Sequence, residues 1–199
     1  MLEAAGLECE RGGRTLFRSL SLALKPGEAL RVAGPNGSGK TSLLRILCGL
    51  LTPSAGEVRW DGAPIRSLRE EYSKHIVYLG HAPAVKDELS AAENLAIACR
   101  LSGTPAAGVE AALERFGLAA DGPAVKRLSQ GQRRRAALAR LALSAGRRLW
   151  LLDEPFSALD TQGIELLKGL CLEQMARGGA VAFTTHQDPG IAAARVIEL

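Results

Sequence analysis

Apolar residues change from alternating to helical spacing within the first third of the chain. They alternate with polar residues over positions 16–24, as in a half-buried strand, and residues 25–28 (Lys-Pro-Gly-Glu) then form a predicted tight turn. A second strand is predicted over 29–33, and apolar residues recur at helical spacing over 42–50. Because residues 34–41 between them are rich in glycine, the pattern predicts the strand, loop and helix of a phosphate-binding unit.

The middle of the chain differs in composition from its two ends. Short strands are predicted over residues 56–60 and 76–79, and the first ends at a turn formed by Asp61 and Gly62. From about residue 89 to residue 144, alanine, leucine, glutamate and arginine recur at helical spacing. This stretch is predicted to form a helical subdomain.

Strand character returns after the helical stretch. Residues 149–152 are almost purely apolar, which is typical of a strand in the buried middle of a parallel sheet. A helix over 163–176, a strand over 180–184 and a short strand over 195–199 complete the pattern. The chain is therefore predicted to have an α/β fold.

Composition and charge narrow the class of protein. The 199 residues are 47% hydrophobic and 23% charged, which is typical of one globular domain with a packed core. No apolar stretch is long enough to cross a bilayer, and Glu3 stands where a secretion signal carries bases, so we expect a soluble, cytosolic chain. The four cysteines lie too far apart in the sequence to indicate a zinc or redox motif, and we expect reduced thiols in the core. The net charge of +4 is small and spread along the chain, so by itself it neither indicates nor excludes binding to nucleic acid or lipid.

Residues 34–41 match the pattern GxxxxGK[ST]. Gly37 and Gly39 let the backbone curl so that successive N–H groups point at phosphate oxygens beside the positive end of a helix. Lys40 is expected against the β and γ phosphates of a nucleotide, and the Thr41 hydroxyl is expected on Mg²⁺. The strand before this loop and the helix after it disfavour the alternative of an ordinary glycine-rich loop. The predicted nucleotide-binding residues here are Gly34, Pro35, Asn36, Gly37, Ser38, Gly39, Lys40, Thr41 and Ser42.

Two adjacent carboxylates, Asp153 and Glu154, follow the buried strand predicted over 149–152. Asp153 can hold Mg²⁺ through water, while Glu154 can orient or deprotonate an attacking water molecule. An apolar run followed by Asp and Glu also occurs by chance at many strand ends. The glycine-rich loop in the same chain favours the catalytic interpretation.

A third motif, Leu-Ser-Gln-Gly-Gln at residues 128–132, opens a helical segment rich in arginine and alanine. Ser129 is a good N-cap, and the N–H groups of Gln130 and Gly131 would form an anion site at the positive helix end. The alternative is a capped helix with no further role.

The glycine loop, the LSQGQ segment and the LLDEP segment, in this order, resemble those of the ATP-binding cassette (ABC) ATPases, whose signature is usually LSGGQ. The resemblance covers essentially the whole chain. It implies a P-loop NTPase core of the RecA-like type, with an ABC-type antiparallel β flank and a helical subdomain. Residues 1–81 and 145–199 would form the core with its flank, and residues 82–144 the helical subdomain.

This resemblance also implies that the chain acts as a head-to-tail dimer. Signature residues of one copy would contact the γ-phosphate of ATP held by the phosphate loop of a second copy, and they are Ser129, Gln130, Gly131 and Gln132. The D-loop at the dimer interface would consist of Ser157, Ala158, Leu159 and Asp160. His186, in the segment Thr184-Thr185-His186-Gln187, matches the switch histidine, and the implied catalytic residues are Lys40, Glu154 and His186. The three arginines at 133–135 are common in the family and would stabilise the interface or a neighbouring loop.

Two positions depart from the family pattern. Ala82 aligns with a glutamine that touches Mg²⁺ and couples to the membrane subunit, and either water or His81 would then complete the metal shell, unless His81 is an uninvolved loop residue. Arg11 lies near the place of an aromatic residue that commonly stacks on adenine. Because a guanidinium can also stack on a base, Arg11 is included among the expected ATP-binding residues.

Several stretches, among them YLGHAPAVKDELSAAENL and LDEPFSALDTQG, make the chain most similar to the ATP-binding subunits of bacterial cytochrome c maturation systems, also described as haem-exporter ATPases. This resemblance implies ATP and Mg²⁺ as cofactors and a location at the cytoplasmic face of the bacterial inner membrane. Two copies of the chain would pair with two copies of a membrane permease subunit, and with further cytochrome c maturation proteins. ATP use would be linked to haem delivery to a periplasmic haem chaperone, and no nucleic acid partner is expected.

Two rival functions stay open at this point. The chain could serve another small ABC importer or exporter, which the co-purifying membrane protein would reveal. A soluble ABC protein of DNA repair or translation is disfavoured, because such proteins carry a long coiled-coil insertion or two cassettes, and this sequence has neither. The sequence also lacks an NKxD motif, which disfavours a GTPase.

Overall fold

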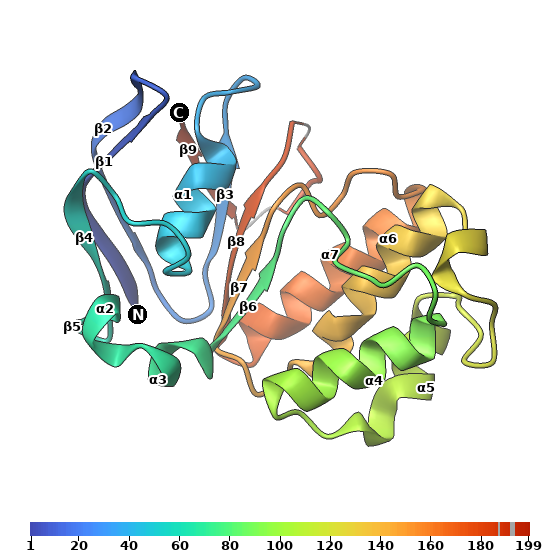
Figure 1. The fold of residues 1–199 in the computed structure, drawn as a ribbon. Coiled ribbons are helices and arrows are strands. Elements are labelled where there is room, and N and C mark those ends of the chain that lie inside the picture. Colours follow the sequence, from blue (N-terminus) through green and yellow to red (C-terminus); the bar gives the residue numbers. More distant parts are fainter. Residues whose placement is uncertain (187, 192–193) are drawn as a thin grey trace.

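A computed structural model describes residues 1–186, 188–191 and 194–199 of the chain. The strands of these residues form two sheets, one antiparallel and one parallel (Figure 1). The antiparallel sheet has the order β2-β1-β4-β5, with bounds Arg14–Leu24, Leu2–Arg11, Ala55–Trp60 and Ala63–Pro64. The parallel sheet has the order β6-β7-β8-β3-β9, with bounds Ile76–Leu79, Leu149–Leu152, Ala180–Thr184, Ala29–Ala33 and Ala194–Glu198.

Helices cover both faces of the parallel sheet (Figure 1). Helix α1 (Lys40–Leu47) lies between the two sheets, and the short helices α2 (Ile65–Leu68) and α3 (Glu70–Ser73) follow the antiparallel strands. Helix α7 (Thr161–Ala176) packs on the opposite face together with the helical segment. The helical segment consists of α4 (Ala91–Ser102), η1 (Ala106–Gly108), α5 (Val109–Arg115), η2 (Val125–Arg127), α6 (Gln130–Leu138) and η3 (Ala139–Leu143).

Strand β7 divides the hydrophobic core in two, because its alternate side chains point to opposite faces of the sheet. Leu149 and Leu151 pack with α1 and the antiparallel strands, whereas Trp150 and Leu152 pack with α7 and the helical segment. All four side chains are fully buried. The prediction of an apolar strand in the middle of a parallel sheet, and with it the α/β fold, is confirmed.

Strand β1 is the largest element that the sequence pattern does not predict. Its buried residues are Leu2 and Ala4 and then Leu7 and Cys9, so the alternation shifts by one position in the middle of the strand. The pairing with β2 has a register shift between Ala4 and Leu7, and Gly6 there has a φ of +56°. A bulge of this kind breaks the two-residue period that identifies a strand.

Helix α1 starts and ends earlier than the predicted range of 42–50. It begins at Lys40 because Gly39, in a left-handed conformation, occupies the N-cap position, and it ends at Leu47, two residues before Gly49 with a φ of +80°. Strands β6, β7 and β8 have the predicted bounds, and the last strand, β9, is shifted by one residue.

The four cysteines are free and buried, as expected. Burial raises the pKa of the Cys171 thiol to about 12, so this thiol stays protonated at neutral pH. None of the described helices is both long and apolar enough to span a bilayer.

Candidate functional site

Four loops meet at the carboxyl edge of the parallel sheet, where the strands β3, β6, β7 and β8 end. In open α/β sheets, ligands bind in the crevice outside this edge. A cavity of about 460 Å³ lies there, and it is lined by Arg11, Leu16, Asn36, Gly37, Gly39, Lys40, Thr41, Ser42, His81, Asp153, Glu154 and His186. The fold therefore brings the phosphate-loop residues, the two carboxylates and the predicted switch histidine to one cavity.

The glycine loop has a backbone that only glycine adopts easily. Gly34, Gly37 and Gly39 have φ values of +141°, +81° and +109°, and a Cβ atom on Gly34 would lie 2.7 Å from the Leu199 carbonyl oxygen. Gly39 caps α1 without a side-chain hydrogen bond, which leaves the first N–H groups of the helix available to a ligand. The Ser38 hydroxyl is buried and has no hydrogen-bond partner among the described residues. These features fit a loop that receives an anion.

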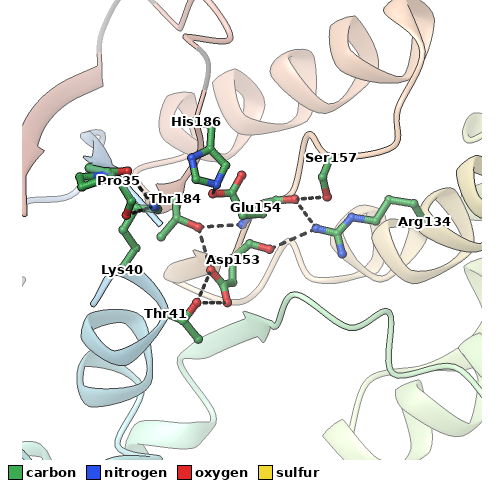
Figure 2. A network of polar contacts seen from close by, with 10 residues as sticks. Pro35, Lys40, Thr41, Arg134, Asp153, Glu154, Ser157, Thr184 and His186 are labelled. Carbon is green, nitrogen blue, oxygen red and sulfur yellow. Dashed lines mark hydrogen bonds and ion pairs between the residues drawn. The ribbon is translucent and has the colours of Figure 1, made fainter. Parts of the chain in front are cut away.

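Lys40 lies over this loop with its ammonium group close to the backbone. Its Nζ atom donates to the carbonyl oxygens of Gly34 at 2.8 Å and Pro35 at 3.0 Å (Figure 2). The side chain is 7% exposed, and both acceptors are uncharged. Lys40 thus brings a positive charge to the loop, and no anionic partner among the described residues neutralises it.

Asp153 accepts hydrogen bonds from two threonine hydroxyls on different elements (Figure 2). Thr41 Oγ1 donates to Asp153 Oδ2 at 2.9 Å, and Thr184 Oγ1 donates to Asp153 Oδ1 at 2.8 Å. The Asp153 N–H donates to the Leu79 carbonyl oxygen at 2.8 Å, which ties the carboxylate to the end of β6. A hydroxyl and a carboxylate are the hard oxygen ligands that Mg²⁺ prefers.

Asp153 and Thr41 do not form a metal site by themselves. Among the described residues, no group of three or more His, Cys, Asp or Glu side chains is placed to hold a metal ion. This is the expected situation for Mg²⁺, which is usually bound by one or two protein groups together with the phosphates of a nucleotide. The donor set of the cavity fits a nucleotide that carries Mg²⁺.

Glu154 follows Asp153 with an unusual backbone conformation. Its φ is +49°, a left-handed value that is uncommon for residues other than glycine. Its N–H donates to Thr184 Oγ1 at 2.7 Å, and its Oε1 lies 3.3 Å from Nε2 of His186 (Figure 2). That Oε1 atom is buried and accepts no hydrogen bond from the described residues. Beside its ion pair with His186, this carboxylate oxygen therefore has unused hydrogen-bonding capacity.

Thr184, the last residue of β8, is a site residue that no sequence motif predicts. One hydroxyl donates to Asp153 and accepts from the Glu154 N–H, so it joins the two carboxylate residues to β8. The side chain is fully buried. Its position at the end of a central strand, two residues before His186, is the signal in the sequence that could have identified it.

Arg134 on α6 is a second supporting residue that the sequence pattern does not single out. The side chain is buried, and its guanidinium donates to backbone carbonyl oxygens that include those of Asp153 and Glu154 (Figure 2). Burial lowers the pKa of Arg134, and the negative charges of Asp153 and Glu154 oppose this shift. In the sequence, this arginine cannot be distinguished from its neighbours Arg133 and Arg135.

The signature segment forms a regular helix start. The predicted N-cap is confirmed, because Ser129 Oγ accepts from the Gln132 N–H at 3.2 Å and Gln132 Oε1 accepts from the Ser129 N–H at 2.9 Å. Gly131 packs closely on the predicted D-loop, since a Cβ atom there would lie 3.2 Å from the Ala158 carbonyl oxygen. Asp160 is the N-cap of α7, and a hydrogen bond from the Gly163 N–H and an ion pair with Arg135 lower the pKa of its carboxyl group.

No residue of the signature segment lines the 460 Å³ cavity. Within one chain, the structure therefore brings together the phosphate loop, both carboxylates, His186 and Arg11, but not the signature residues. His81 lines the cavity, whereas Ala82 is exposed and lies outside its lining. Gln187, the last residue of the predicted switch segment, lies outside the described residues.

A second cavity, of about 510 Å³, lies between β6 and the helical segment. It is lined mainly by residues of α3, β6, α4 and η3, among them Tyr78 and Leu95, and by Arg147 from the turn before β7. None of the described residues that were predicted for the site lines this second cavity.

Comparisons with known proteins agree with this geometry. The sequence profile of the ABC transporter family matches residues 17–157. A cytochrome c biogenesis ATP-binding export protein CcmA of Aromatoleum aromaticum is 55% identical, with 94% of this chain and 89% of the relative covered. The CcmA proteins of Nitrosomonas europaea and Nitrosospira multiformis are 51% and 50% identical, with 94% and 100% of this chain and 89% and 97% of the relatives covered.

Solved structures share the fold at lower sequence identity. An ABC transporter ATP-binding protein from Pyrococcus furiosus superimposes with a TM-score of 0.84 at 26% identity, covering 98% of this chain and 96% of that protein. A dimeric ATP-binding cassette in a post-hydrolysis state, bound to ADP and Pi, gives a TM-score of 0.83 at 26% identity, covering 100% of this chain and 94% of that one.

Proposed function

The chain belongs to the ABC transporter family, among its cytochrome c biogenesis ATP-binding export proteins, and from this premise we propose that it binds and hydrolyses ATP in the 460 Å³ cavity. One observation carries the proposal. Three separate segments converge on the cavity, with Lys40 at the start of α1, Asp153 and Glu154 after β7, and His186 after β8. ATP hydrolysis requires a cradle for phosphate, a metal ligand and a group that activates water, and the cavity offers all three.

The glycine loop and Lys40 hold the phosphates in this proposal. The N–H groups at the start of α1 point toward negative charge, and the Lys40 ammonium exchanges its two uncharged carbonyl acceptors for phosphate oxygens. Thr41 and Asp153 provide oxygen ligands for Mg²⁺, which, when bound, neutralises charge that develops on the phosphate oxygens. Arg11 lines the cavity beside Leu16 and supplies a planar group on which the adenine base can stack.

Glu154 and His186 act on the γ-phosphate side. The Oε1 of Glu154, which accepts no hydrogen bond from the described residues, accepts one from the attacking water and takes its proton, as a general base does. His186, with its Nε2 3.3 Å from that oxygen, limits where the carboxylate can turn and contacts the γ-phosphate. Half of the His186 side chain is exposed, which leaves it free to meet a ligand at the mouth of the cavity.

The signature segment serves a second copy of the chain. Ser129, Gln130 and Gly131 are exposed or half-exposed at the start of α6, so the N–H groups of Gln130 and Gly131 can reach a phosphate held by another chain. The D-loop lies beside this segment and would line the same interface. A division into a core (1–81 and 145–199) and a helical subdomain (82–144) would let the signature segment move with the helices.

We extend the proposal to the complex in which the chain works. Two copies pair with two copies of a membrane permease subunit at the cytoplasmic face of the bacterial inner membrane, and further cytochrome c maturation proteins join them. ATP hydrolysis then drives c-type cytochrome biogenesis through the delivery or export of haem to its periplasmic chaperone. Identities of 50% or more to three CcmA proteins over nearly the whole chain support this choice among ABC systems.

Deletion of the gene tests this function in its host. Covalently bound haem in c-type cytochromes is measured in the deletion strain and after complementation with the wild-type gene or with a Lys40→Ala variant at equal protein level. We expect the haem signal to disappear on deletion and to return with the wild type alone. Normal c-type cytochromes in the deletion strain would refute the role in cytochrome c biogenesis and leave an ABC ATPase of another system.

A further inference from the structure

The three consecutive arginines at the start of α6 have different surroundings. Arg133 forms an ion pair with Asp87, and Arg135 forms one with Asp160, so each of them meets a carboxylate near the surface. Arg134 is only 4% exposed and, among the described residues, donates to no carboxylate. Within the described part of the chain, its guanidinium donates to backbone carbonyl oxygens alone, which is an unusual use of a buried charge.

The acceptors of Arg134 belong to two segments that are far apart in the sequence. After β7, Nη2 donates to the carbonyl oxygens of Glu154 at 2.6 Å and Asp153 at 3.2 Å, and Nε reaches that of Pro155 at 3.4 Å. After β6, Nη1 donates to the carbonyl oxygen of His81 at 3.2 Å. The planar guanidinium fixes the directions of these donors, so one rigid group joins the two loops that flank the cavity.

The segment after β7 needs such support, because Glu154 has a left-handed backbone. A residue with a side chain keeps this conformation only where its surroundings over-determine it. The Glu154 carbonyl oxygen accepts from Arg134 and also from Ser157 Oγ at 2.8 Å, while the Glu154 N–H is held by Thr184 (Figure 2). Both peptide groups around Glu154 are therefore anchored, and Arg134 is the only charged anchor among the described residues that hold them.

We propose that Arg134 is a positioning residue for ATP hydrolysis: it holds the backbone of Glu154 so that the carboxylate faces the cavity, and it ties this backbone to the loop of His81. The inference rests on the proposed function, since it assigns to Glu154 the activation of water. Arg134 itself lines no part of the cavity, so it acts through Glu154 and not on the nucleotide.

Arg134→Gln and Arg134→Lys test this role in the purified chain. Gln keeps one donor and loses the charge, whereas Lys keeps the charge but not the planar fork. We expect kcat for ATP hydrolysis to fall about 10- to 100-fold in Arg134→Gln and less in Arg134→Lys, because a small misplacement of a catalytic group has effects of this size. The KM for ATP is expected to stay within about twofold, because the phosphate loop is untouched.

Arg147→Gln is the matched control. Arg147 also donates to backbone carbonyl oxygens of two distant segments, those of Ser73 and Lys74 and that of Ser102, but it lies outside the 460 Å³ cavity and its loops. Its loss is expected to lower the thermal midpoint as much as Arg134→Gln does, with kcat unchanged. Equal losses of kcat in both variants would assign to Arg134 a structural role only and would overturn the proposal.

A double-mutant cycle with Glu154→Gln separates positioning from general stability. If Arg134 acts through the Glu154 carboxylate, Arg134→Gln changes the slow residual hydrolysis of Glu154→Gln by less than about threefold. Losses that multiply in the double variant would contradict the proposal. The same holds if Arg134→Gln folds and keeps its kcat within twofold of the wild type.

The folding of the Arg134 variants and the ATPase activity of the wild type are measured in the same experiments. If Arg134→Gln does not fold, Arg134→Lys carries the test, and failure of both to fold would make the residue structural and overturn the proposal. If the wild-type chain shows no ATPase activity, or an activity that does not depend on Lys40 and Glu154, the proposed function itself is refuted. Normal, Glu154-dependent hydrolysis in folded Arg134 variants would refute only the positioning role.

Discussion

The loops at the carboxyl edge of the parallel sheet and the start of α6 both present groups that suit phosphate, but they are built in different ways. At the sheet edge, Gly34, Gly39 and Glu154 have positive φ values, and Asp153 and Thr184 are buried polar residues that hold one another. At the start of α6, a regular capping box satisfies the helix end close to the surface. The sheet edge contains a cavity, whereas the helix start contributes no residue to it.

This difference shows which half of the proposed site is prepared within one chain. Strained backbone and buried polar groups are costly, and they persist where a site must be fixed before its ligand arrives. A capped helix end requires neither strained backbone nor buried polar groups. It becomes a binding site only when a second surface brings a phosphate to it. We infer that one chain carries a complete catalytic half and a separate recognition half for its partner.

Lys40→Ala is expected to give the largest effect, because it removes the only lysine that lines the cavity within the described residues. ATP hydrolysis should fall by about 1000-fold, a loss typical of removing a group that stabilises transition-state charge. Phosphate release by the purified chain measures this. Lys25→Ala, which changes an exposed turn, is the control, and unchanged turnover in Lys40→Ala would remove the catalytic half from the account.

Glu154→Gln is expected to separate binding from chemistry. The change keeps the size of the side chain and removes the base, so turnover should fall by about 100-fold or more while ATP still binds. Binding of a fluorescent ATP analogue and phosphate release are measured on the same sample. Glu165→Gln, an exposed carboxylate paired with Lys168 on α7, should behave as the wild type. A wild-type rate in Glu154→Gln would exclude Glu154 as the base.

Thr184→Val tests the cost of the buried polar groups. Valine fills the same space but leaves Asp153 Oδ1 and the Glu154 N–H with one partner fewer, which should lower the free energy of unfolding by about 2 kcal/mol. Urea denaturation measures this value. Thr52→Val, at an exposed position, should change it by less than about 0.5 kcal/mol. An equal, small change in both variants would mean that the sheet edge is not held by this hydroxyl.

Ser129→Ala should have the smallest effect on stability. It removes one hydrogen bond of the capping box, and such losses cost about 1 kcal/mol at an exposed helix end. Urea denaturation again measures the free energy of unfolding. Gln132→Ala, which removes the other side-chain hydrogen bond of the capping box, is measured beside it. A loss as large as that of Thr184→Val would contradict the view that the two regions are built differently.

From the sequence, the residues of the catalytic half can be predicted more completely than the strands and side chains that hold them in place. Strands β6, β7 and β8 are short apolar runs with clear ends, and the residues that follow them are the ones that line the cavity. Strand β1 escapes prediction because its bulge at Gly6 interrupts the alternation. The spacing of apolar residues along the chain identifies the short strands. The bulged strand, in contrast, depends on its pairing with distant strands.

Arg134 shows why a supporting residue cannot be found by pattern alone. Three arginines in a row are equivalent in the sequence, but consecutive residues of a helix point about 100° apart, so only one of them faces the segment after β7. Which one does so depends on how α6 packs against the sheet. The role of Thr184 likewise follows from its contacts with Asp153 and Glu154 after β7, not from its neighbours in the sequence.

The mass of the Glu154→Gln chain in ATP and Mg²⁺ tests the central claim, that the catalytic half of one chain and the recognition half of another form the site between them. Light scattering with a nucleotide count should show a dimer of two 21.0 kDa chains that holds two ATP molecules. Adding Ser129→Arg should return the protein to monomers that still bind one ATP each, because only the recognition half is damaged. A Glu154→Gln chain that binds ATP and stays monomeric, or a dimer that persists with Ser129→Arg, would contradict the account.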